Sequence, residues 1–179
     1  GGANIEAKLE GSGNTALIIA AGQGHGKAIT ALVHGGADVE AKSKMANTAL
    51  IIATQEGHVG AVEALLHGGA DVEAKTKDGF NALIIAAQLG HVGAITALLR
   101  GGADVEAKNN NDMTALMMAA YNGRTEAAAA LLKGGADPTA KAGPGPAEGK
   151  TALEVSAMQE EHEAVAALLR QAAGGGDAS

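Results

Sequence analysis

The chain repeats one short motif five times. The block GGADVEAK occurs at 35–42, 68–75 and 101–108, and looser copies begin at Gly1 (GGANIEAK) and Gly134 (GGADPTAK). Equivalent alanines in successive copies are 34 residues apart once and 33 residues apart three times. A period of about 20 to 50 residues is typical of a stacked array, in which each unit packs only on its neighbours. Such an array offers an extended surface and seldom a buried reaction site.

Composition limits how the copies pack and what they bind. Apolar residues make up 46% of the 179 residues but aromatic residues only 1%, so burial relies on small aliphatic side chains packed closely. There is no cysteine, which excludes disulfides and thiolate metal sites and is compatible with an intracellular location, cytoplasmic or organellar after processing. The net charge of −7 disfavours nucleic acid, and the sequence contains no stretch long enough to insert in a membrane.

One copy predicts two short helices and a turn. Apolar side chains fall at helical spacing in two stretches, Leu83, Ile84, Ala86 and Ala87 in the first and Ile95, Leu98 and Leu99 in the second. We expect Gly90 and Gly101 to adopt the left-handed conformation that ends a helix. Small and polar residues then alternate around the turn at Asp78-Gly79, which predicts a short extended finger.

At these residues the chain resembles the ankyrin repeat. The family pattern has an Asp-Gly finger turn, then T-P-L-H-x-A-A, G-H, an L-L pair and G-A-D-x-N-A. Those places are taken here by Asp78-Gly79, Asn81 to Ile84, Gly90-His91, Leu98-Leu99 and Gly102 to Ala107. The family proline is alanine in all five copies, and the family histidine is replaced by Ile18, Ile51, Ile84, Met117 and Glu154.

The resemblance implies an all-α solenoid of five helix pairs with short β-hairpin-like finger turns. We expect a single array over residues 1–173, with helix pairs that start near 15, 48, 81, 114 and 151. The last step is 37 residues because of an insert at 142–149 (AGPGPAEG), which predicts a longer, stiffer finger loop. Residues 174–179 are expected to form a flexible tail.

Two motifs suggest cofactor or metal chemistry, and we expect neither. The glycine-rich segment 22–27 lies between two predicted helices, and Lys27 is followed by alanine rather than by the serine or threonine of a phosphate loop. His25, His58 and His91 share one register, but packed helices lie roughly 8 to 10 Å apart whereas zinc sits about 2 Å from each imidazole. The resemblance implies that these histidines tie down the inter-helix loop.

The acidic residues recur with the period as well. The series comprises Asp38, Asp71, Asp104 and Asp137 with Glu6, Glu40, Glu73 and Glu106. Acid and base catalysis needs two carboxyl groups in unlike environments, whereas a ladder offers the same environment several times. We therefore expect a chain that is not an enzyme and that has no cofactor.

Partners of the resembled family usually contact the finger turns and the exposed end of the first helix. Carried over to this chain, these places are Met45, Asn47, Lys77, Asp78, Phe80, Leu89, Asn110, Met113, Tyr121 and Asn122. Phe80 and Tyr121 are the only aromatic residues. We predict that they form one exposed apolar patch with Leu89 and Met113. In the alternative interpretation, Phe80 covers its own turn and Tyr121 covers the thin fourth repeat.

These observations favour a non-catalytic protein-binding module or adaptor, whose partner is a protein and which is a monomer alone or a subunit of a complex. Two alternatives stay open at this point. One is a structural linker or scaffold subunit held permanently in a larger assembly. The other is an engineered binder of consensus type, which the near-identical copies suggest.

Overall fold

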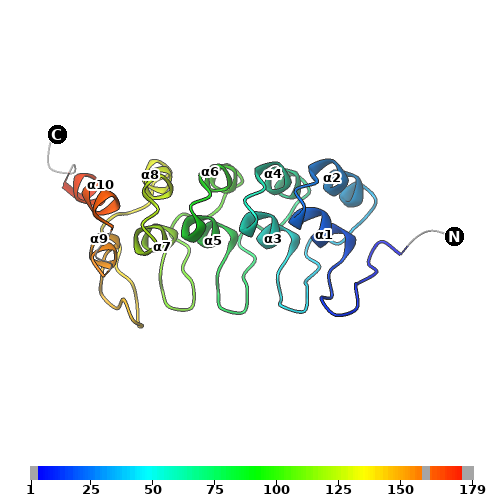
Figure 1. The fold of residues 1–179 in the computed structure, drawn as a ribbon, viewed down its shortest axis with the longest axis horizontal. Coiled ribbons are helices and arrows are strands. Elements are labelled where there is room, and N and C mark those ends of the chain that lie inside the picture. Colours follow the sequence, from blue (N-terminus) through cyan, green and yellow to red (C-terminus); the bar gives the residue numbers. More distant parts are fainter. Residues whose placement is uncertain (1–3, 159–161, 175–179) are drawn as a thin grey trace.

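The computed structural model describes residues 4–158 and 162–174 of the chain. Within these ranges the chain forms ten helices, which are arranged as five pairs in a row (Figure 1). Their bounds are α1 (Ala16–Gly22), α2 (Gly26–His34), α3 (Ala49–Gln55), α4 (Val59–His67), α5 (Ala82–Leu89), α6 (Val92–Arg100), α7 (Ala115–Tyr121), α8 (Thr125–Lys133), α9 (Ala152–Ser156) and α10 (Glu163–Gly174). The predicted all-α solenoid of five helix pairs is confirmed.

The helices form two rows with the finger loops along one side. The first helices of the pairs (α1, α3, α5, α7 and α9) stand next to the fingers, and the second helices form the other row (Figure 1). Each helix packs on its partner and on the equivalent helix of the next pair. In the described ranges, the only β-bridge joins Lys108 and Thr114 at the base of one finger. We call the surface made by the finger loops and the first helices the finger face.

Each first helix begins at the same kind of N-cap. The capping residues are Thr15, Thr48, Asn81, Thr114 and Thr151, and each side-chain oxygen accepts a hydrogen bond from the backbone N–H three residues later. Such a cap stabilises a helix by about 1 kcal/mol. Because the caps recur in register, the five first helices begin at equivalent places.

The glycines at the helix ends follow the prediction in one case and contradict it in the other. Gly90 ends α5 with φ of 81°, as expected. Gly101 has φ of −76°, and the left-handed residue is Gly102 with φ of 89°. The prediction for Gly101 is wrong because the chain reverses one residue later, where the N–H of Ala103 donates to the carbonyl of Leu98.

Neighbouring copies are joined by hydrogen bonds from backbone to carboxylate. The Oε1 atoms of Glu6, Glu40, Glu73 and Glu106 each accept from the N–H of an aspartate in the next copy, at 2.8 to 2.9 Å. The acidic residues of the predicted ladder therefore serve the stack of repeats.

The histidines also reach between copies. The Nε2 atom of His58 lies 3.2 Å from the carbonyl oxygen of Gly22, and that of His91 lies 3.1 Å from the carbonyl oxygen of Gln55. Arg124 takes this place in the fourth pair, where its Nε donates to Gln88. The inter-helix loop of one copy is thus tied to the first helix of the copy before it.

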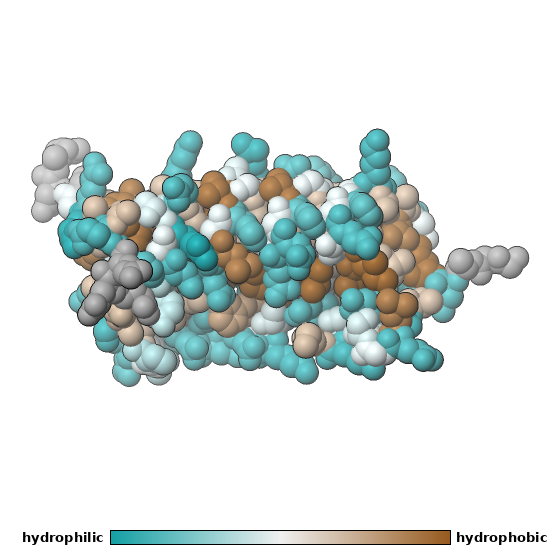
Figure 2. All heavy atoms as spheres, in the orientation of Figure 1, coloured by the Kyte–Doolittle hydropathy of each residue, from teal (hydrophilic) through white to brown (hydrophobic). Residues whose placement is uncertain are grey.

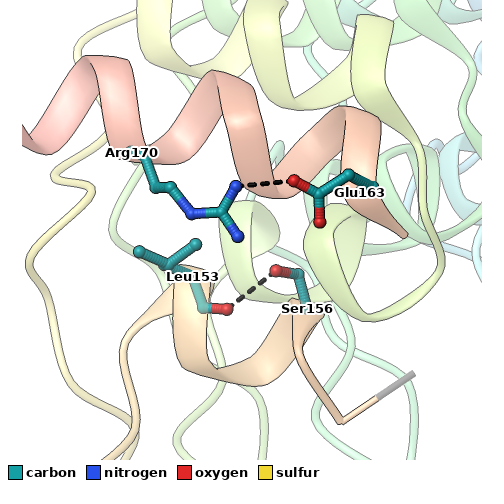
Figure 3. Close-up of polar contacts among 4 residues, drawn as sticks. All are labelled: Leu153, Ser156, Glu163 and Arg170. Carbon is teal, nitrogen blue, oxygen red and sulfur yellow. Dashed lines mark hydrogen bonds and ion pairs between the residues drawn. The ribbon is translucent and has the colours of Figure 1, made fainter. Parts of the chain in front are cut away.

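The fifth pair has polar contacts of its own. An ion pair joins Arg170 and Glu163 on α10 at 2.7 Å, and the Ser156 hydroxyl donates to the carbonyl of Leu153 on α9 (Figure 3). The hydrogen bond and the charge of Arg170 hold the pKa of the Glu163 carboxyl below its usual value. Both groups of the ion pair are exposed, so it adds little to the free energy of unfolding.

Three stretches of the predicted organisation lie outside the described residues. These are residues 1–3 and 159–161 of the predicted array and residues 175–179 of the predicted tail. Gly174, which the prediction assigned to the tail, is the last residue of α10. No helix in the described part of the chain combines the length and the apolar character needed to cross a bilayer.

Two threonines of the second helix pair, one at the N-cap of α3 and one inside it, allow a matched test of buried polar groups. Thr54 is fully buried, and its hydroxyl finds no hydrogen-bond partner among the described residues, whereas Thr48 caps the helix. Thr54→Val should raise the free energy of unfolding by about 1 kcal/mol, because an unpaired hydroxyl is replaced by a methyl group. Thr48→Val should lower it by about 1 kcal/mol through loss of the cap. Urea unfolding of both variants checks this, and a change of the same sign in both would contradict it.

The second helices differ in how well they fill one core position. It is fully buried in every pair and holds Ile29, Val62, Ile95, Ala128 and Val165. Because stability in such an array is a sum of local and nearest-neighbour terms, the small Ala128 should make the fourth pair the weak link. Amide hydrogens of α8 should therefore exchange faster than those of α6. Ile95→Ala should cost about 2 to 5 kcal/mol and bring exchange in α6 up to the rate in α8. Equal protection of α6 and α8 in the unsubstituted chain would overturn this.

Candidate partner-binding face

The finger face contains two adjoining grooves. The larger, the finger groove, has a volume of about 590 Å³ and lies between two fingers over α3 and α5. Its lining residues are Lys44, Met45, Asn47, Gln55, Thr76, Lys77, Asp78, Phe80, Ile85, Gln88 and Leu89. Hydrophilic residues dominate the edge where the fingers end, and hydrophobic residues gather over the helices (Figure 2). The finger groove thus combines a charged rim with a few apolar side chains.

The smaller groove, which we call the methionine groove, has a volume of about 220 Å³. Its lining residues are Phe80, Asn109, Asn111, Met113, Met118, Tyr121, Pro146, Ala147 and Met158. None of these described residues carries a charge at neutral pH. Phe80 lines both grooves, so the two adjoin at this residue.

The structure divides the predicted apolar patch between the two grooves. Phe80, Met113 and Tyr121 come together in the methionine groove, whereas Leu89 lies in the finger groove. Four more of the predicted residues line the finger groove, namely Met45, Asn47, Lys77 and Asp78.

Two predicted residues line neither groove. The side-chain amide of Asn110 donates to the carbonyl of Lys77 at 3.3 Å, and that of Asn122 donates to the carbonyl of Met118 at 2.8 Å. Both amides are therefore engaged with the backbone of the repeat.

The exposure of the predicted residues varies more than the sequence suggested. Met45 is 75% exposed, Leu89 40% and Tyr121 39%. Phe80 and Met113 are half-buried and pack against the core, so neither projects freely from its finger. Phe80 is both a wall of the grooves and part of the packing of its own turn.

The insert at 142–149 supplies a wall that the sequence did not reveal. Its ends are joined because the N–H of Gly149 donates to the carbonyl of Ala142. The insert packs so closely on the preceding finger that a Cβ at Gly143 would overlap Asp112. This closeness brings Pro146 and Ala147 to the methionine groove.

Sequence reasoning also missed Asn109, Met118 and Met158. Met158 occupies the register of Tyr121, Gln88 and Gln55 once the longer final step of 37 residues is counted. The predicted binding residues include this register only up to Tyr121 in the fourth copy. Extending it to the fifth would have identified Met158 as a residue of the finger face.

A third hollow, of about 400 Å³, lies on the row of second helices. Glu63 and Leu66 of α4 and Ala97 and Arg100 of α6 are among its lining residues. None of the predicted binding residues lines it.

The described residues that line the grooves can contribute shape, charge and hydrogen bonds to binding, and they show no metal site and no shifted pKa value. Among the described residues, no group of three acidic, histidine or cysteine side chains could hold a metal ion. In the part of the chain that the structure describes, the groups with shifted pKa values are Asp137, Glu154, Glu163 and Arg170, and none of them lines a groove. The pKa of Glu154, for example, is held below its usual value by hydrogen bonds from the backbone N–H and hydroxyl of Thr151. These shifts arise from hydrogen bonds and charges within a finger turn and the last two helices.

Comparison with known proteins agrees with this geometry. The family model described as ankyrin repeats (3 copies) matches residues 1–76 and 69–142, which is more than half of the chain. The fifth helix pair lies beyond residue 142 and packs on the fourth pair as the other pairs pack on one another. A search of curated proteins found no match. The chain belongs to the ankyrin-repeat family.

Proposed function

We propose that this chain is a non-catalytic adaptor that binds a protein partner across the two grooves of its finger face. Ankyrin repeats are generally protein–protein interaction modules and are typically non-catalytic. The observation that carries the proposal for this chain is the meeting of a charged groove and an uncharged groove at Phe80.

The distribution of side chains on the finger face supports this use. Protein interfaces have an apolar centre with aromatic and methionine side chains and a polar rim. Here Phe80, Tyr121 and the methionines supply the centre, and Lys44, Lys77 and Asp78 supply the charged rim. Among the described residues, the buried core contains aliphatic residues and methionines but no aromatic ring. The register of Tyr121 holds Gly22, Gln55 and Gln88 in the first three copies, so an aromatic side chain here is specific to the fourth copy.

Tyr121→Ala tests the proposal most directly, because Tyr121 is both aromatic and exposed. Truncation should weaken binding of the partner by about 2 kcal/mol, roughly thirtyfold, as expected for an aromatic anchor. The free energy of unfolding should change by no more than about 0.5 kcal/mol, as is usual at the surface. The partner is first captured from an extract of the source organism and identified, and its dissociation constant is then measured with purified proteins.

Arg100→Ala provides the matched control, since Arg100 is exposed in the hollow on the row of second helices. Binding should be unchanged in this variant. If Arg100→Ala weakens binding and Tyr121→Ala does not, the partner binds the second helices and the proposal fails. A partner that stays at fixed stoichiometry through every purification step would instead indicate a permanent scaffold subunit.

A further inference from the structure

One residue that lines the methionine groove has a buried hydrogen-bond donor without a partner. Asn109 is only 5% exposed, and within the described ranges its Nδ2 atom has no acceptor. Its Oδ1 atom accepts from the N–H of Asn111 at 2.9 Å and from the N–H of Met113 at 3.1 Å. These two bonds fix which end of the amide is the oxygen, so the unpaired atom is the NH₂ group.

Equivalent fingers close without an amide side chain. At the same register, the hydroxyls of Ser43 and Thr76 accept from the backbone N–H four residues later, at 3.2 Å in each case. The Oδ1 atom of Asn109 makes the same closing bond to Met113. The closing bond therefore does not require an amide, and the NH₂ group is surplus to the architecture of the finger. A buried donor without a partner lowers the free energy of unfolding by the full cost of its desolvation, and such donors are rare in native proteins.

The size and the lining of the groove indicate what could supply the acceptor. Its volume of about 220 Å³ is below the roughly 300 to 1,000 Å³ of pockets that hold small organic ligands, and it suits one side chain of a larger molecule. The described lining residues are uncharged and mostly apolar, which disfavours a charged anchor. The neighbouring finger groove extends the same surface, so a chain that enters one groove can continue into the other.

We propose that the methionine groove receives one uncharged apolar side chain from an extended segment of the partner protein, and that the Asn109 amide donates to a backbone carbonyl of that segment. This inference rests on the proposed function and adds the chemistry of the partner. The Nδ2 atom is closed to solvent in the free chain, so lining side chains move when the segment binds. Met113, Met118 and Met158 allow this movement, because unbranched thioether side chains repack readily.

The first experiment uses a displayed library of random dodecapeptides, selected on the immobilised full chain. We expect the selected peptides to share one large aliphatic or aromatic residue. A synthesised peptide is then added to the chain labelled at the methionine methyl groups. Of the five methionines, Met113, Met118 and Met158 line the methionine groove, Met45 lines the finger groove, and Met117 is buried in the core. The methyl resonances of Met113, Met118 and Met158 should shift, and the side-chain amide protons of Asn109 should move downfield.

The matched variant is Asn109→Thr, which installs the residue that closes the preceding finger at Thr76. It keeps the acceptor for the closing bond and removes the NH₂ group. The acceptor for the N–H of Asn111 is lost as well, but Asn111 is exposed, so water can replace it. Peptide affinity should fall about tenfold, as expected when one hydrogen bond is lost and the carbonyl is left unpaired. The melting temperature of the free variant should not fall, because an unpaired buried group has been removed. Met158→Ala, at a side chain that is 43% exposed, should weaken binding without affecting the finger.

The outcomes separate this inference from the proposed function. If the peptides shift only Met45, or if Asn109→Thr binds as tightly as the unsubstituted chain, the inference fails and the finger face remains the proposed binding surface. If selected peptides bind without shifting any methionine of the finger face, both fail. If Asn109→Thr lowers both the affinity and the melting temperature, Met158→Ala decides between the outcomes. Weaker binding by Met158→Ala at an unchanged melting temperature supports the inference, and unchanged binding contradicts it.

Discussion

Close approach between neighbouring copies is the constraint on which the rest of the structure depends. At Gly24 and Gly57 the backbone is left-handed, and a Cβ would press on the imidazole of His58 or His91 in the next copy. The first helices bury alanines fully at the same interface. This spacing lets a histidine reach the carbonyl of the preceding pair, and lets a glutamate reach the aspartate N–H of the next copy. Packing and hydrogen bonding therefore depend on the same spacing.

The same constraint explains why the large side chains lie where they do. An interface lined with alanine and glycine has no room for an aromatic ring, so Phe80 and Tyr121 lie at the finger face instead. Phe80 is half-buried because it packs against the core on one side and lines the two grooves on the other. A side chain in that position stabilises its own finger and shapes the groove beside it. The stability of the finger and the shape of the binding surface are thus coupled at this residue.

The sequence predicted those features that depend on local chemistry repeated in register. Thr15, Thr48 and their equivalents mark helix starts, since a side-chain cap acts within three residues. The choice between Gly101 and Gly102 could not be made, because either glycine tolerates the left-handed conformation and only the packed chain selects one. The direction of the insert at 142–149 depends on its contact with Asp112 in another copy, and no local pattern records that contact. The spare amide of Asn109 is likewise visible only when its neighbours are known.

The departures from the repeat converge in space although they are scattered in the sequence. The register that holds Gln55 and Gln88 in the finger groove holds Tyr121 and Met158 in the methionine groove. One position of the repeat is thus polar in the middle copies and apolar in the last two, and the insert and Asn109 differ from the other copies at the same end. A partner that lies across both grooves would meet charged and amide groups at one end and methionines at the other. Because the two ends differ chemically, reversing such a partner would place its apolar anchor among Lys44, Lys77 and Asp78. The repeated framework therefore supplies the surface, and the few residues that break the repeat make its two ends different, so that a partner would bind in one orientation.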